Sequence, residues 1–108
     1  MSTTDRFDII FKALADGRRR EILDLLRDAP KTTGELCAHF ARELDRCTVM
    51  QHLSVLENAD LLIVQRKGKF RWNHLNPLPL KEISDRWIQP RARGAVQLLA
   101  KLKKDLED

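Results

Sequence analysis

The chain has 108 residues, which is enough for one domain with a modest hydrophobic core. With 43% apolar and 33% charged residues its composition is globular rather than disordered, and its formal net charge of +4 suits a polyanionic partner. Residues 1–6 lack the basic and apolar regions of a secretory signal, and runs such as residues 61–64 are too short to span a bilayer, so we expect a cytoplasmic protein without membrane contact.

Two short amphipathic helices are expected first. Asp5 is the expected N-cap of a helix over residues 5–14, and Asp16 is the expected N-cap of the second helix. The first turn of the second helix contains three arginines at positions 18–20, which oppose the helix macrodipole. A nearby phosphate would explain Arg19 in this place, and a solvated surface is the alternative.

A helix-turn-helix is expected over residues 33–60. Thr32 and Glu35 have the spacing of a capping box, and the helix that they open turns Leu36, Phe40 and Leu44 inward. Asp45 follows a short turn and can cap the next helix, which ends near Asp60, where a left-handed residue is needed. Two helices joined in this way form a candidate DNA-binding motif.

The second of these helices has an uncharged outer face. Val49, Leu53 and Leu56 recur at helical spacing and predict its buried side. Solvated faces usually carry Lys and Glu, whereas short neutral groups suit base edges in a major groove, although a plain polar surface helix is the alternative. The side turned away from the core carries the neutral residues Cys47, Thr48, Gln51, Ser54 and Asn58.

A β-hairpin is expected over residues 62–75. Its strands cover residues 62–67 and 70–75, and Gly68 forms the turn. Four of the six residues 66–71, at the tip of the hairpin, are cations. This density favours contact with phosphates or a minor groove over a solvated edge. These cations are Arg66, Lys67, Lys69 and Arg71.

The C-terminal third is expected to mediate dimerisation. Residues 76–79 are expected to interrupt regular structure, and a helix over residues 81–88 would turn Ile83 and Trp87 inward before Gln89-Pro90 ends it. The last segment has apolar residues at heptad spacing, which favours pairing with a second copy over packing on its own domain. This seam consists of Ala92, Ala95, Leu99, Leu102 and Leu106.

Five segments together carry a family resemblance. Residues 14–23 read L-A-D-G-R-R-R-E-I-L, and residues 34–36, 48–57, 66–69 and 74–77 read G-E-L, T-V-M-Q-H-L-S-V-L-E, R-K-G-K and H-L-N-P. In this order they resemble the ArsR/SmtB-type regulators over about residues 7–78. The resemblance implies a mainly α (α+β) winged helix-turn-helix with a two-stranded wing, in one domain over residues 1–108. It also implies a dimeric bacterial transcriptional regulator, a repressor of an inverted-repeat operator, that acts at the nucleoid.

The residue pattern and the family resemblance together indicate the site residues. Thr48, Gln51 and Ser54 are expected to read bases, because Gln pairs naturally with adenine. The DNA backbone is assigned to Arg19, His52, Arg66, Lys67, Lys69 and Arg71, although a packing role for His52 is the alternative. The resemblance places the dimer interface in the first and last helices, residues 5–14 and 78–108, with Phe7, Phe11, Leu99, Leu102 and Leu106. Met50 and Asp60 depart from the family's usual Ser and Gly.

No metal or cofactor is expected. Cys37 and His39 stand where metal-sensing relatives carry Cys-x-Cys, but two ligands do not make a zinc or arsenite site. The alternative is a metal- or thiol-responsive repressor that uses Cys37 and His39, with Cys37 or Cys47 as the thiol of a redox switch. Another alternative is a winged-helix module that binds protein instead of DNA. An enzyme is not expected, because no nucleophile has a placed base and no Gly-rich phosphate loop is present.

Overall fold

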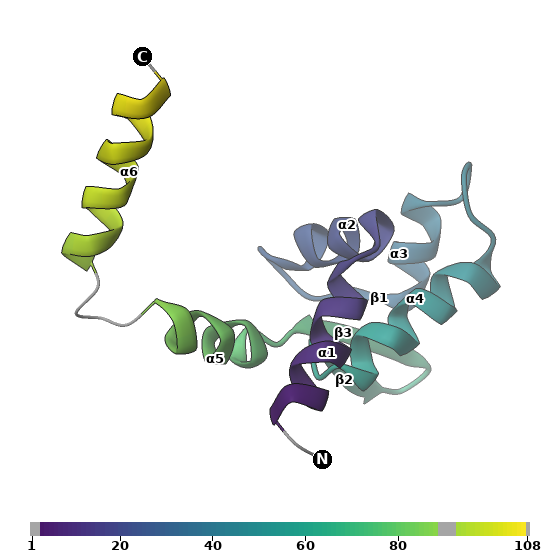
Figure 1. Ribbon diagram of the computed structural model, residues 1–108. Helices are drawn as coiled ribbons and strands as arrows, with labels where there is room; N and C mark the ends of the chain where they lie inside the picture. Colours follow the sequence, from purple (N-terminus) through teal and green to yellow (C-terminus); the bar gives the residue numbers. More distant parts are fainter. Residues whose placement is uncertain (1–2, 89–92, 108) are drawn as a thin grey trace.

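The computed structural model describes residues 3–88 and 93–107. Its helices and strands surround one core, and the last helix projects from this body (Figure 1). In chain order the elements are α1 (Thr3–Leu14), α2 (Gly17–Leu26), β1 (Lys31–Thr32), α3 (Thr33–His39), α4 (Arg46–Asn58), β2 (Leu62–Lys67), β3 (Phe70–Leu75), α5 (Leu78–Trp87) and α6 (Arg93–Glu107).

Helices α1 to α4 and strand β2 enclose the core. Helix α4 contacts α1, α2, α3 and β2, so its inner side lies at the centre of the domain. Burying these apolar side chains is the main stabilising contribution, at about 25 cal/mol for each Å² removed from water. The fully buried residues include Ile10, Ile22, Leu36, Phe40, Val49, Leu53, Leu56 and Leu61.

Three of the four predicted N-caps are confirmed. The carboxylate of Asp16 accepts from Arg18 N at 2.8 Å, and that of Asp45 accepts from Thr48 N at 2.7 Å. Thr32 and Glu35 form the reciprocal capping box. The prediction for Asp5 is wrong, because α1 already begins at Thr3 and Asp5 lies within its first turn, where a carboxylate also favours the macrodipole.

The sheet has three antiparallel strands in the order β1-β3-β2. The hairpin has the predicted bounds, pairs Leu62 with Leu75 and Lys67 with Phe70, and turns at Gly68 with φ of 60°. The predicted two-stranded wing therefore gains a third strand at its base. Strand β1 has two residues, too few to show an alternating pattern, and buried Asn73 ties β3 to it by donating to Lys31 O at 3.2 Å.

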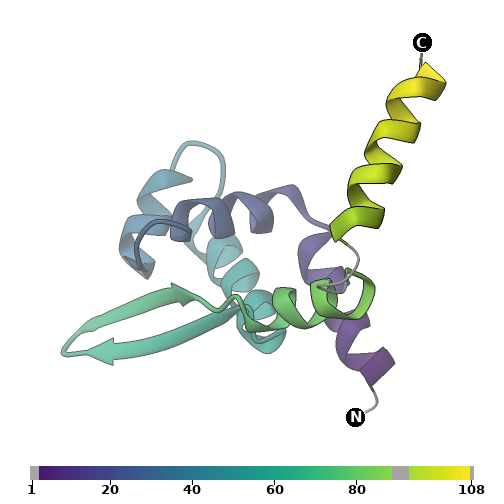
Figure 2. The same ribbon diagram turned by 90° about the vertical axis from the view of Figure 1, so that its left-hand side faces the viewer.

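The C-terminal predictions need two corrections. Helix α5 begins at Leu78, so residues 76–79 do not interrupt the structure throughout, because proline is tolerated in a first helical turn and Pro79 lies there. Trp87 does not point into the core: its side chain is 60% exposed, although its ring centroid lies 6.1 Å from those of Phe7 and Phe11. The predicted Gln89-Pro90 break and Ala92 lie outside the described residues. Figure 2 shows α6 standing clear of the body, far from the hairpin.

Candidate nucleic-acid interface

Helix α4 has the two faces that its sequence predicts. Val49, Leu53 and Leu56 are fully buried against the neighbouring helices and β2. Gln51 and Ser54 are exposed on the opposite side. Because its inner side is buried so deeply, the backbone of α4 is held in place, and so are the positions from which the polar side chains of the other side project.

The outer face of α4 combines four exposed neutral side chains with one apolar side chain. Val55, which is 37% exposed, was not among the predicted site residues. Counting about 100° per residue would have placed it beside Gln51, and a methyl-bearing side chain there suits the methyl group of thymine. We call the exposed set Cys47, Gln51, Ser54, Val55 and Asn58 the outer row.

Thr48 lies at the edge of this row and is half-buried. Its backbone amide and its side chain both bond to the Asp45 carboxylate, and these bonds lower the pKa of Asp45 below its ordinary value. The Thr48 hydroxyl is thus engaged in capping α4. Of the three predicted base-reading residues, Gln51 and Ser54 present the more accessible side chains.

The side chain of Arg19 joins α2 to the end of α1 by hydrogen bonds. Only 17% of its side chain is exposed, and it donates from Nε to Ala13 O at 2.7 Å and from Nη2 to Lys12 O at 3.0 Å. Arg20 donates likewise to Leu14 O at 2.6 Å. These arginines oppose the dipole of α2, but they also cap the C-terminal carbonyls of α1, where cations are stabilising.

Arg19 also contacts His52, which lies on the side of α4. Arg19 Nη1 lies 3.2 Å from His52 Nδ1, and the half-buried imidazole lies outside the outer row. Burial alone would raise the pKa of Asp16, but the amides of Arg18 and Arg19, with His52 and the Arg19 guanidinium, bring that pKa below its ordinary value. His52 and Arg19 therefore connect α4 to the α1–α2 corner.

The wing carries two kinds of cation. Arg66, Lys67 and Lys69 are exposed at the hairpin tip. Arg71 is 23% exposed and forms an ion pair with Glu57 of α4. The hairpin tip can therefore meet phosphates, whereas Arg71 fixes the base of the wing to α4.

The cysteines do not gather with other ligands. Cys37 is half-buried, Cys47 is exposed, and both are free thiols. His39 Nε2 lies 3.1 Å from Glu21 Oε1. Within residues 3–88 and 93–107, no group of three or more His, Cys, Asp or Glu side chains could hold a metal ion. None of the helices in these ranges has the length and apolar character needed to cross a membrane.

Apolar side chains are exposed on α1, α5 and α6. Phe11 and Trp87 stack with an interplanar angle of 23° and remain open to solvent on one side. Phe7, also expected at the dimer interface, is buried beneath Trp87 at 7% exposure and supports this surface from inside. Among the described side chains of α6, the large apolar ones that are exposed are Leu98, Leu99, Leu102 and Leu106.

Comparisons with known proteins give a consistent picture. A model of the bacterial regulatory proteins of the arsR family matches residues 16–64, from the cap of α2 into β2. The transcriptional repressor SdpR of Bacillus subtilis is 35% identical over 79 residues, which cover 73% of this chain and 84% of that protein. An HTH-type transcriptional regulator of Mycobacterium tuberculosis is 38% identical over 104 residues, which cover 92% and 94% respectively.

The fold is also similar to solved structures. The crystal structure of an ArsR family transcriptional regulator superposes with a TM-score of 0.68 at 24% identity, over 95% of this chain and 98% of that chain. This likeness concerns the fold. The predicted mainly α architecture with a hairpin wing is confirmed.

Proposed function

The chain belongs to the arsR family of bacterial regulatory proteins, and on that premise we propose that it is a homodimeric repressor of an inverted-repeat operator. The family consists of DNA-binding transcriptional regulators without enzymatic activity. We place the protein in the bacterial cytoplasm, at the nucleoid.

The observation that carries this proposal is the outer row of α4. Gln51 and Ser54 offer donors and acceptors that fit base edges, and no ionised side chain belongs to the row. Protein interfaces are enriched in aromatic residues, Met and Arg, and the outer row contains none of these. We assign base reading to Gln51, Ser54 and Val55, with Thr48 at the edge.

The cations divide into two roles in this proposal. Arg66, Lys67 and Lys69 contact the phosphate backbone or the minor groove from the wing, because they are exposed and lie at a turn that projects from the body. Arg19, His52 and Arg71 act mainly by holding α4 and the wing in place, since each of these side chains already contacts another part of the protein.

The second copy is assigned to the apolar surfaces of α1, α5 and α6. A helix with four exposed leucines needs a partner surface, and a two-fold axis through α6 lets each copy cover the other. Such symmetry can place two α4 helices about 34 Å apart, which is one turn of duplex DNA and explains an inverted-repeat operator.

The proposal is tested by DNA selection and by mass. The intact protein is used to select sites from a random DNA pool, and light scattering after size exclusion gives its mass. We expect twice the mass of one chain, a palindromic selected site, and affinity that falls steeply with salt. A transcription assay with this site upstream should show repression.

Two results would contradict the proposal. A monomer with a single ungapped half-site would exclude the dimer arrangement. A chain that binds no DNA at low salt but retains a protein partner would instead indicate a winged-helix interaction module.

A further inference from the structure

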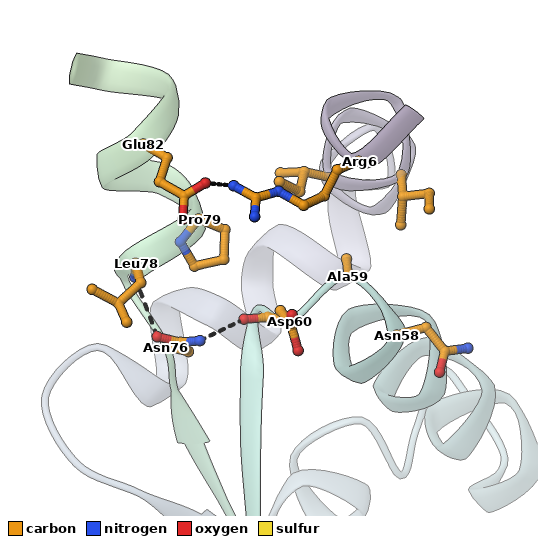
Figure 3. A pocket seen from close by; sticks show the side chains of 10 residues that line it. Arg6, Asn58, Ala59, Asp60, Asn76, Leu78, Pro79 and Glu82 are labelled. Atoms are coloured by element: carbon orange, nitrogen blue, oxygen red, sulfur yellow. Dashed lines mark hydrogen bonds and ion pairs between the residues drawn. The ribbon is translucent and has the colours of Figure 1, made fainter. Parts of the chain in front are cut away.

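A cavity of about 360 Å³ lies where α1, the end of α4 and the start of α5 meet. Its volume is at the lower end of the range for small-molecule sites. Arg6 comes from α1, Asp60 follows α4, and Asn76 and Glu82 lie on the β3–α5 side (Figure 3). The cavity is formed by three separate segments of the chain. None of the residues to which we assign DNA contact lines it, although Asn58 at the end of the outer row does.

Asp60 is the unusual residue of this cavity. Its φ of 60° is left-handed, a conformation that glycine adopts without strain and that most other residues avoid. Both backbone polar groups of Asp60 are hydrogen-bonded: its N donates to Glu57 O at 2.9 Å, and its O accepts from Asn76 Nδ2 at 2.8 Å. Within the described part of the chain, no hydrogen bond or ion pair engages its carboxylate. A free carboxylate therefore stands where glycine would serve the backbone better.

The charges around the cavity are predominantly negative. Arg6 and Glu82 form an ion pair that joins α1 to α5 at one edge of the cavity, so these two charges compensate each other (Figure 3). Asp60 remains uncompensated on the other side. The C-terminal end of α4 adds the negative partial charge of a helix dipole close to Asp60. Such a field favours a cation and disfavours an anion.

The remaining wall is apolar. Ile9 and Ile10 of α1 and Leu78 and Pro79 of α5 contribute apolar side chains to the lining of the cavity. Apolar side chains offer no ligands to a hydrated metal ion, and a metal would need more ligands than one free carboxylate. From the combination of one free carboxylate and an apolar wall, we propose that this cavity binds a small organic cation, namely a protonated amine or guanidinium with a short apolar chain.

A ligand in this cavity would be placed to influence DNA binding. It would contact the end of α4, which carries the outer row, and also α1 and α5, which carry the exposed Phe11 and Trp87. A ligand that binds the DNA-bound and free states unequally changes DNA affinity, and DNA then changes ligand affinity by the same factor. This inference goes beyond the proposed function, because ligand binding itself is measured on the free protein.

The test uses hexylammonium chloride as the probe and ¹⁵N-labelled full-length protein. We expect saturable shifts at the amides of Ile9, Ile10, Ala59 and Asp60. Hexan-1-ol should bind at least about tenfold more weakly, because it lacks the charge-assisted bond to Asp60, and hexanoate should not bind. Asp60→Asn removes the charge but tolerates the left-handed backbone, so it should fold normally and lose about tenfold or more in affinity for hexylammonium.

A matched control removes a carboxylate elsewhere. Asp24 is exposed on α2, which does not line the cavity, so Asp24→Asn makes the same change in net charge and should leave binding unchanged. Equal affinity of Asp60→Asn and the unsubstituted protein would overturn the proposal. So would tighter binding of hexanoate than of hexylammonium, or the absence of saturable shifts at the cavity. None of these results depends on whether the protein binds DNA.

Discussion

Helices α4 and α6 are both amphipathic, but only α4 has its apolar side covered. Val49, Leu53 and Leu56 of α4 are fully buried, and what remains exposed is mainly neutral and polar. In α6 the leucines themselves are exposed, Leu102 by 50% and Leu106 by 78%. The exposed side of each helix therefore reflects the chemistry of its partner. The row on α4 suits base edges, and the stripe on α6 suits a second copy of the chain.

The largest expected effect is on the buried side of α4. Leu53→Ala leaves a cavity at the centre of the core and should destabilise the protein by about 2–5 kcal/mol. The free energy of unfolding is measured by urea denaturation followed by circular dichroism. Gln97→Ala, at an exposed polar position of α6, is the control and should change the stability little. Similar losses for both variants would remove the contrast between the two helices.

The next effect concerns the exposed stripe of α6. Leu102→Asp places a charge in the proposed dimer interface and should weaken dimerisation by about 2–4 kcal/mol, as for a central interface residue. Analytical ultracentrifugation gives the dissociation constant, and affinity for the palindromic site should fall with it.

Gln97→Asp provides the matched control for this change. Gln97 lies on the opposite side of α6 from Leu102 at helical spacing, so the same added charge should leave the dimer intact. If both variants dissociate equally, or neither does, α6 is not the dimerisation helix.

A smaller effect separates the cations of the wing. Arg66→Ala should lower the slope of log affinity against log salt by about one unit, because one phosphate contact is lost. Arg71→Ala should change this slope less, since Arg71 is paired with Glu57, and should weaken binding through a loosened wing. Fluorescence anisotropy at several salt concentrations measures both slopes. A full unit lost for Arg71→Ala and none for Arg66→Ala would reverse the assignment.

The smallest effect is expected at the helix caps. The folded protein lowers the pKa of Asp16 and of Asp45, so both contribute stability above their unfolded pKa of about 3.9 and lose it as pH falls through the folded values. The melting temperature should therefore drop as pH falls below about 4. Asn also caps helices, so an Asp16→Asn/Asp45→Asn variant should fold and show a flatter acid limb. An unchanged acid limb would count against this cause.

Features set by local signals could be predicted from the sequence. Asp16, the Thr32–Glu35 pair and Asp45 start their helices as predicted, and Gly68 turns a hairpin of the predicted length. The two sides of α4 followed from helical spacing alone. These features depend on residues within one turn or one hairpin of each other, so the sequence carries the whole signal.

Features that depend on distant partners could not be predicted. Nothing in the sequence around Arg71 indicates that Glu57 meets it, and an arginine that will face a carboxylate looks the same as one that will face a phosphate. Likewise Arg19 caps α1 only because α1 and α2 meet at a corner. The cavity at Asp60 arises from three segments, and the early start of α5 was hidden because Pro77 and Pro79 resemble a break.

Base reading by the outer row of α4 can be measured on a complete set of operator variants. Affinities of the unsubstituted protein and of Gln51→Ala are compared on the selected operator and on every single-base variant of one half-site, at one salt concentration. We predict that Gln51→Ala loses about 1–3 kcal/mol of discrimination at one base pair in each half-site and keeps the salt slope. An equal loss on every sequence, with the preferences unchanged, would contradict the account.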